Sequence, residues 1–462
     1  MFKKMNWLMK LVLITAFAGF VFFVFAPVLR TFFDPQEFLT FLNPLGAGMP
    51  FGEYMINGWS WNNNEGDLIG FFRPLASATY IVEYPLFGMN PLGYKLVSMG
   101  IHLLCAVFVA KFVMLLSGKK WLALFAGALF TVHPGTLVAT GMISARPDVM
   151  ASLFSILALI STYSLSRNSK TTWKALVPAI FLLFSLASKE LGMVNIITLP
   201  IMYFLWPGRE KNKKNTIVFL SSLIVVGFFY FVVRNMIFGN VGGYGSYTGL
   251  TKIPLHLAIL IAQATGVFFI KSTIVKLAVY LAFLFVIINY ARVELERWRK
   301  VGVAALITGA YGFQSIIGDT ATHYAYAPSL FALLFIVYFA ERITISGPRG
   351  KQLLGGIAII ILLFAGVLTR RESLAFNHIY VDCEGVFNSL EEISDLLPDE
   401  SGSVCFVVVS RDSAIQAEMK NVPMYMNSID KNSQCEFVLI GNYEEATGSP
   451  VLVWEADRIV IR

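Results

Sequence analysis

The chain has 462 residues, of which 56% are hydrophobic and only 14% are charged. This composition excludes an ordinary soluble globular protein and predicts a polytopic membrane protein. The net charge of +7 is unevenly divided, since residues 1–373 hold 31 Lys and Arg against 14 Asp and Glu, whereas residues 374–462 hold 5 against 15. The basic excess of residues 1–373 is explained by loops that face an anionic membrane surface. It therefore does not indicate nucleic-acid binding.

Eleven apolar runs approach the length of about 20 residues that a helix needs to cross a membrane. They occur at 7–29, 94–116, 121–138, 149–166, 174–187, 191–206, 216–235, 274–290, 301–317, 324–340 and 353–369. The first run resembles a signal peptide in its flanking charge, but no small-residue cleavage site follows it, so we expect a retained span. The predicted fold class is an all-α polytopic membrane protein with about eleven transmembrane helices.

The loops between these runs predict the orientation of the chain. Basic clusters at 3–4, 119–120, 167–174, 208–214, 291–300 and 341–352 fall on one side, which the positive-inside rule makes cytoplasmic. The opposite, extracytoplasmic side receives the long first loop at 30–93. The apolar segment 255–270 is expected to lie in the outer interface or re-enter it, because a span there would put the basic run 291–300 on the wrong side.

The composition changes abruptly near residue 374. Residues 1–373 are therefore expected to form the transmembrane catalytic domain, and residues 374–462 a small α/β domain on the extracytoplasmic side. The second region combines a helix-like stretch, EGVFNSLEEISDLLP, with β-rich pieces VCFVVVS, EFVLIG, PVLVW and RIVIR.

Ionisable residues at membrane depth or at the ends of spans are costly, so each is a candidate for function. On the predicted topology they share the outer side: Asp34, Glu37, Arg73, His102, His133, Arg146, Asp148, Lys189, Glu190 and His323. Arg offers phosphate oxygens a planar fork and Lys a point charge, so these cations suit an anionic lipid headgroup. A carboxylate beside them could take a proton from an acceptor hydroxyl. The pattern indicates transfer of a group away from a lipid phosphate.

Four motifs carry a resemblance to a known family. FRPLASATYIVEYPLFGMNPLGYKLVSMGIHLL, HPGTLVATGMISARPDVMASLFSILAL, SLASKELGMV and HYAYAPSLFALL follow one another in register over residues 72–335. They resemble segments of membrane glycosyltransferases of the GT-C superfamily, in particular the transmembrane-and-TPR O-mannosyltransferases and their shorter bacterial relatives. The segment after 373 is not covered by this resemblance.

The resemblance implies an inverting glycosyltransferase that uses a polyprenyl-phosphate-linked sugar on the extracytoplasmic face of the inner or plasma membrane. Its catalytic base would be Asp34, because FFDPQEF resembles the family's (F/Y)DD pattern, with Pro35 in place of the second acidic residue and Glu37 nearby. The donor phosphate would be held by Arg73, Arg146, Lys189 and His323, supported by Glu37, His133, Asp148 and Glu190. His323 stands where the family has arginine. Neither a metal nor a cofactor is expected.

Each of these residues also has a structural interpretation. Arg146 and Asp148 could form an ion pair that organises a turn, and His133 could cap a helix before Pro134. Lys189 could pair with Glu190 at the membrane interface. The sequence alone leaves these alternatives open.

The leading hypothesis is transfer of a sugar to an extracytoplasmic hydroxyl, with a cell-envelope glycan, a lipid-linked glycan or a protein as acceptor. The expected partners are thus the polyprenyl-linked sugar, its acceptor and membrane lipids. One rival is a flippase or transporter of lipid-linked saccharides, although such proteins usually carry internal repeats. A second rival is a polymerase or ligase that uses the same donor chemistry on a longer glycan.

Overall fold

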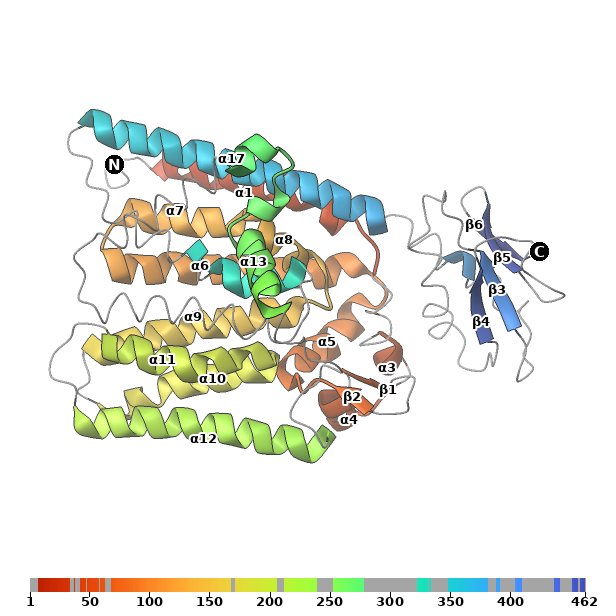
Figure 1. The fold of residues 1–462 in the computed structure, drawn as a ribbon, viewed down its shortest axis with the longest axis horizontal. Coiled ribbons are helices and arrows are strands. Elements are labelled where there is room, and N and C mark those ends of the chain that lie inside the picture. Colours follow the sequence, from red (N-terminus) through yellow and green to blue (C-terminus); the bar gives the residue numbers. More distant parts are fainter. Residues whose placement is uncertain are drawn as a thin grey trace.

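The structure is a computed structural model whose main body is a bundle of helices lying roughly along one direction (Figure 1). It describes residues 7–33, 37, 42–46, 48–57, 59–62, 68–167, 171–205, 212–238, 252–277, 322–330, 332–333, 348–380, 388–390, 404–408, 436–440, 451–455 and 458–461. The bundle consists of α1 (Trp7–Leu29), α6 (Pro91–Ser117), α7 (Lys120–Thr131), α8 (Pro134–Gly141), α9 (Arg146–Arg167), α10 (Val177–Ser188), α11 (Val194–Leu205), α12 (Lys213–Phe238) and α17 (Pro348–Tyr380).

Three of the described helices, α6, α9 and α12, are long and apolar enough to cross a membrane. The bent pair α7 and α8 would be a fourth if it forms one span. Of the three, α9 is the most enclosed, whereas α12 leaves most of its apolar surface uncovered, as expected for a helix in contact with lipid. The prediction of eleven spans is not tested by these helices, because the run 301–317 and most of the run 274–290 lie outside the described residues, as does about half of the run 324–340.

The predicted span 121–138 is not one straight helix. It divides into α7 and α8, whose axes differ by 54°. The break falls at His133, which has an extended backbone, and at Pro134, which begins α8. Proline lacks the N–H that a continuous helix would need and its ring opposes the preceding turn, so a sharp bend occurs there.

A second break separates α10 from α11 and is important for the site. Lys189 ends α10 in an extended conformation, with φ −159° and ψ 143°. It is followed by a 3-10 turn, η4 (Glu190–Met193), before α11 begins. The sequence predicts this break, since the runs 174–187 and 191–206 leave residues 188–190 between them.

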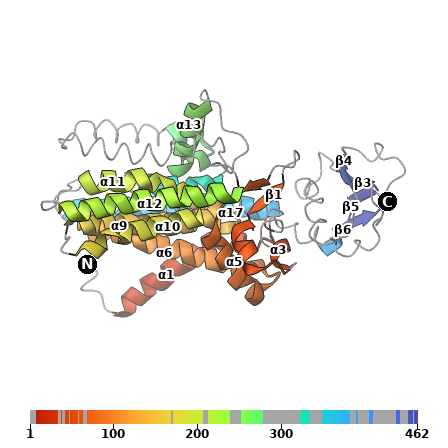
Figure 2. The ribbon, with the colours of Figure 1, turned by 90° about the horizontal axis from the view of Figure 1, so that it is seen from below.

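The first loop is largely folded. It contains α3 (Asn43–Gly46), α4 (Phe51–Asn57), a hairpin of β1 (Ser60–Asn62) and β2 (Leu68–Gly70), and α5 (Pro74–Phe87). These elements gather at the end of the bundle that faces the C-terminal sheet, as Figures 1 and 2 show. Tyr54, Trp59 and Tyr80 of these elements are buried in a second hydrophobic core, which also includes Met150 of α9 and residues of the C-terminal region such as Leu452. The loop therefore provides a rigid cap against which charged side chains can be held.

The apolar segment 255–270 contains a short helix, α13 (Ile253–Ala264), followed by the 3-10 turn η6 (Val267–Phe269). Twelve residues extend only about 18 Å, too little to cross a bilayer. The helix lies crosswise to the bundle in both views (Figures 1 and 2). This arrangement fits the expectation of an interfacial or re-entrant helix.

The C-terminal region contains a four-stranded sheet in the order β4-β3-β5-β6. The strands are β3 (Val404–Val408), β4 (Glu436–Ile440), β5 (Val451–Glu455) and β6 (Arg458–Ile461), at the four predicted β-rich pieces. β3 is parallel to β4 and β5, and β6 is antiparallel to β5. Helix α17 continues to Tyr380, beyond the expected domain boundary at 373, and most of the predicted helix at 384–398 lies outside the described residues.

Candidate active site

The break after α10 places Lys189 against the first turn of α9. Lys189 Nζ lies 2.6 Å from Asp148 Oδ2, and both side chains are almost fully buried. The ammonium group also lies 4.4 Å from the centre of the Tyr324 ring. Burial lowers the pKa of Lys189, while the Asp148 carboxylate opposes that shift. The pair therefore holds a cation and a carboxylate at the end of the bundle.

The next residue, Glu190, makes a second buried ion pair. Its Oε1 accepts a hydrogen bond of 2.9 Å from Arg73 Nη2, at the start of α5. The Arg73 guanidinium also lies over the rings of Trp59 and Phe71, at 4.9 and 4.3 Å from their centres. The charges of Arg73 and Glu190 both act on Lys189. One short turn thus joins the first loop and α9 through two neighbouring pairs, and brings together four residues predicted for the site.

Arg146 is fully buried and occupied by protein partners. It donates hydrogen bonds to Ser98 Oγ, Thr79 Oγ1, Glu83 Oε1 and the Tyr94 carbonyl, at 2.9, 2.9, 2.6 and 2.8 Å. Burial raises the pKa of Glu83, and the Arg146 charge opposes that shift. The structural interpretation of Arg146 therefore fits better than phosphate contact, although its carboxylate partner is Glu83 rather than Asp148.

The predicted histidines differ in role. His133 Nδ1 accepts a hydrogen bond from the Gly135 N–H at 3.1 Å, so it caps α8. His102 is fully buried between the Tyr326 hydroxyl and the Thr131 carbonyl, at 2.7 and 3.0 Å. His323, in the 3-10 turn η7 (Thr322–Ala325), is only half-buried, and its ring contacts the Tyr324 ring that lies beneath Lys189. Of the three, His323 is the one placed beside the ion pairs.

Asp34 lies outside the described residues, but the chain on either side of it is anchored. Glu37 is buried, and its Oε1 accepts hydrogen bonds from the backbone N–H groups of Ile143 and Ser144 at 2.6 and 3.0 Å. A carboxylate that accepts two backbone N–H groups is serving as an anchor for the segment before α9. This contact ties the first loop to the HPGT…SARPD segment.

The residue that anchors the other side, Lys95, was missed by sequence reasoning. Lys95 Nζ donates to the carbonyl oxygens of Val28, Thr31 and Phe32 at 3.2, 2.6 and 3.3 Å, and also contacts Thr31 Oγ1. A cation at the carboxyl end of α1 also complements the helix dipole. Lys95 and Arg234 are, like the other candidates, ionisable residues near the ends of predicted spans, and that pattern would have identified them.

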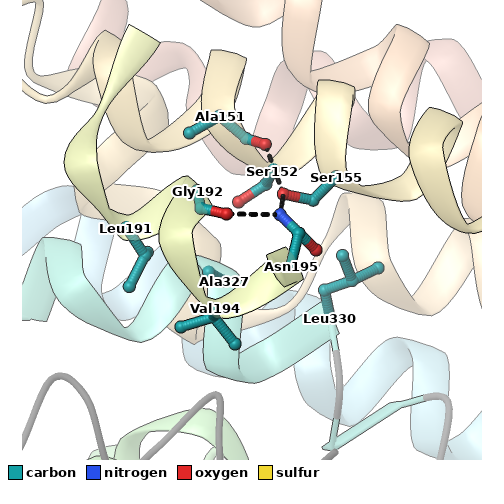
Figure 3. Close-up of a pocket in the computed structure, with 9 residues that line it drawn as sticks. All are labelled: Ala151, Ser152, Ser155, Leu191, Gly192, Val194, Asn195, Ala327 and Leu330. Atoms are coloured by element: carbon teal, nitrogen blue, oxygen red, sulfur yellow. Dashed lines mark hydrogen bonds between the residues drawn. The ribbon is translucent and has the colours of Figure 1, made fainter. Parts of the chain in front are cut away.

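A small cavity is lined in part by Leu191 and Gly192, in the turn that follows Lys189 (Figure 3). Its volume is about 20 Å³, enough for one water molecule and far too small for a sugar or a lipid. Its polar wall includes Ser152, Ser155 and Asn195, and Asn195 Nδ2 donates to Ser155 Oγ and to the Gly192 carbonyl. These hydrogen bonds stabilise the turn, and the cavity itself is not a substrate pocket. Within the part of the chain that the structure describes, no three His, Cys, Asp or Glu side chains are grouped so as to hold a metal ion.

Comparisons with known proteins agree with these features. No protein-family model matches the chain. Protein O-mannosyl-transferase Tmtc1 of Drosophila melanogaster is 28% identical over 198 residues, which cover 38% of this chain and 23% of that protein. Protein O-mannosyl-transferase TMTC2 of Homo sapiens is 33% identical over 105 residues, which cover 22% of this chain and 13% of that protein. The chain thus spans less than a quarter of the length of these relatives.

The fold is shared with a solved bacterial structure. ArnT from Cupriavidus metallidurans bound to undecaprenyl phosphate superposes with a TM-score of 0.54 at 14% identity, over 97% of both chains. ArnT in the apo state gives a TM-score of 0.52 over 94% of this chain and 86% of that one. The chain is therefore similar to GT-C membrane glycosyltransferases, in sequence to the O-mannosyl-transferases and in fold to ArnT, as its motifs predict.

Proposed function

We propose that the protein is an inverting glycosyltransferase that moves a sugar from a polyprenyl-phosphate donor to an acceptor hydroxyl. The observation that carries this proposal is the Lys189–Glu190 turn, which holds two buried cation–carboxylate pairs at one end of the helical bundle. The similarity in fold to a protein solved with undecaprenyl phosphate supports a lipid-linked donor. The similarity in sequence to O-mannosyl-transferases supports sugar transfer to a hydroxyl.

In this proposal Arg73, Lys189 and His323 face the donor phosphate. Each cation already has a carboxylate or ring partner that fixes its position, so little reorganisation is needed when the phosphate arrives. Asp148 and Glu190 act as positioning residues for Lys189 and Arg73. Arg146 positions the first turn of α9 through its contacts with α5 and α6, and His133 and Glu37 fix the segment between α7 and α9.

The proposed base is Asp34. It takes the proton of the acceptor hydroxyl as that oxygen forms a bond with the anomeric carbon. The bond between the anomeric carbon and the phosphate oxygen breaks at the same time, and the polyprenyl phosphate leaves with the electron pair. A single displacement of this kind inverts the anomeric centre. Asp34 follows Phe32 by two residues and precedes Glu37 by three, so the anchors formed by Lys95 and Glu37 restrict where it can lie.

We further propose the membrane arrangement expected from the charged loops. Residues 1–373 would cross the membrane about eleven times, and residues 374–462 would form a small extracytoplasmic α/β domain. The acceptor would then be a cell-envelope glycan, a lipid-linked glycan or a protein exposed on that side. The location of the described sheet beyond the cap of the bundle supports this assignment (Figure 1).

The test is a transfer assay with the purified full chain in proteoliposomes and synthetic polyprenyl-phosphate sugars. We expect release of polyprenyl phosphate together with a glycosylated product, and loss of both with Asp34→Asn. The matched control is Lys214→Met. Lys214 is exposed and lies in the first turn of α12, at the end of that helix away from the first loop. Movement of the headgroup across the bilayer without cleavage would contradict the proposal and support a transporter.

A further inference from the structure

The buried cations of the site are not equally free to bind a ligand. Arg73, Arg146 and Lys189 each have a carboxylate partner within 3 Å: Glu190, Glu83 and Asp148 respectively. These three pairs are therefore close to neutral before any phosphate arrives. An anionic headgroup would be bound more strongly by a cation whose charge is not already compensated.

Arg234 is such a cation. It lies in the last turns of α12 and is only 2% exposed. Its Nη2 donates to the Gly70 carbonyl at 3.2 Å, whereas Nε and Nη1 have no hydrogen-bond partner. No carboxylate among the described residues forms an ion pair with it. A buried guanidinium with unsatisfied N–H groups destabilises a fold, and the contacts of the described residues do not offset that cost.

The surroundings of Arg234 connect it to the candidate site. Tyr230, one turn earlier on α12, hydrogen-bonds the Phe72 carbonyl at 3.4 Å, next to Arg73 in sequence. The Tyr230 hydroxyl also hydrogen-bonds the Arg234 guanidinium and is in electrostatic range of Arg73 and Glu190. Arg234 therefore belongs to the same end of the bundle as the two ion pairs.

The close approach of α12 to the first loop depends on Gly70. A Cβ atom at Gly70 would lie 1.9 Å from the Phe238 ring, so no other residue fits there without a shift. Glycine thus brings the β2 backbone against the final turn of α12, where its carbonyl fixes one nitrogen of Arg234. The guanidinium is oriented by two neutral partners, the Gly70 carbonyl and the Tyr230 hydroxyl, and among the described residues no carboxylate compensates its charge.

We infer that Arg234 is the principal oxyanion-binding residue of this protein, and that two of its nitrogens bind the phosphate of the polyprenyl-linked donor. This inference rests on the proposed function, since the donor class comes from there. Arg73 and Lys189 then orient the headgroup, while Arg234 supplies the net positive charge that binds it. The unpaired Nη1 lies beside Nη2, whose second N–H is not used by the Gly70 carbonyl, and such a pair of parallel N–H groups matches the geometry of two phosphate oxygens.

The experiment measures binding to the purified full chain in detergent, with undecaprenyl phosphate and the neutral alcohol undecaprenol as probes. We expect wild type to bind undecaprenyl phosphate at least tenfold more tightly than undecaprenol. Arg234→Met should lose that preference, Arg234→Lys should keep part of it, and Lys214→Met at the other end of α12 should match wild type. Unchanged affinity of Arg234→Met for undecaprenyl phosphate would overturn the inference.

Thermal unfolding without ligand separates a binding role from a structural one. Because Met removes an uncompensated buried charge, ligand-free Arg234→Met should unfold at the same temperature as wild type or higher. A lower unfolding temperature would identify a structural residue and overturn the inference. Competition with inorganic phosphate distinguishes the source of the anion. If inorganic phosphate displaces bound undecaprenyl phosphate, the site accepts free phosphate. If it does not, the site requires the lipid-linked group.

The inference and the proposed function can fail separately. Arg234-dependent binding of undecaprenyl phosphate without sugar transfer from any donor would contradict the proposed function and leave the oxyanion site standing. Sugar transfer by Arg234→Met with an unchanged KM for the donor would contradict the inference and leave the function standing.

Discussion

Buried charges in this protein fall into two groups that sequence alone could not separate. Arg146 is saturated by neighbours on α5 and α6, whereas Arg234 keeps two nitrogens without partners. Both are arginines near the ends of apolar helices, so position and residue type are the same. The difference lies in partners that are distant in sequence, such as Glu83, which no local pattern predicts.

Arg146→Met should unfold the protein more easily, because it leaves the Glu83 carboxylate buried without its cation. Removing one partner of a buried pair typically costs about 3–5 kcal/mol of stability. The measurement is thermal unfolding of the variant against wild type. The double variant Arg146→Met with Glu83→Leu removes both charges and should recover most of the loss, and a double variant as unstable as the single one would refute a stabilising role for the pair.

Lys95→Met should reduce kcat for sugar transfer by up to about 100-fold while the donor KM changes little. Lys95 fixes the carbonyls of Thr31 and Phe32 shortly before Asp34, and a misplacement of about 1 Å at a reacting group can cost that much. Steady-state kinetics with a synthetic donor provide the check. A rise of up to about 100-fold in the donor KM with an unchanged kcat would show that Lys95 affects donor binding instead.

At the scale of elements, hydropathy located the helices better than their interruptions. The runs that predict α6, α9 and α12 are uniform in composition, so their existence follows from the sequence. The bend at His133 required attention to Pro134, and the folding of the first loop was not expected at all. That loop is held by contacts such as Tyr80 with the Ile143 carbonyl at 2.6 Å, which join segments far apart in the chain.

The Lys189 turn depends on Gly192. A Cβ atom there would lie 2.6 Å from Ser185 Oγ and 2.8 Å from the backbone nitrogen of Leu186. Gly192→Ala should therefore displace the turn, lower thermal stability and reduce sugar transfer. The control is Gly356→Ala in α17, where nothing lies within 4 Å and alanine should be neutral or stabilise the helix by up to about 1 kcal/mol. Equal behaviour of the two variants would show that the turn tolerates a side chain.

In the whole molecule, Lys189, Arg73 and Arg234 lie at one end of the bundle, and we propose that Asp34 acts there with them. The class of protein and the four motifs could be derived from the sequence, because hydropathy and motif order are local properties. The pairing of charges could not, since each pair joins elements that only the fold brings together. The number of spans and the side of the membrane on which the C-terminal sheet lies stay predictions.

Cysteine accessibility tests that arrangement in intact cells. Single cysteines placed in the exposed residues Glu53 of α4 and Met89 after α5 should react with an impermeant maleimide added outside, and a cysteine in place of Lys213 should not. All native cysteines are replaced by serine first. Labelling of Lys213→Cys alone from outside would reverse the proposed orientation.

The most direct test of the central claim is a structure of the protein with a non-hydrolysable polyprenyl phosphonate sugar. The account predicts that the phosphonate oxygens contact Arg234, Lys189 or Arg73, and that the Asp34 carboxylate lies within hydrogen-bonding reach of a hydroxyl placed about 3–3.5 Å from the anomeric carbon. A headgroup bound away from the Lys189 turn, or an Asp34 carboxylate on the far side of the sugar from any acceptor path, would contradict it.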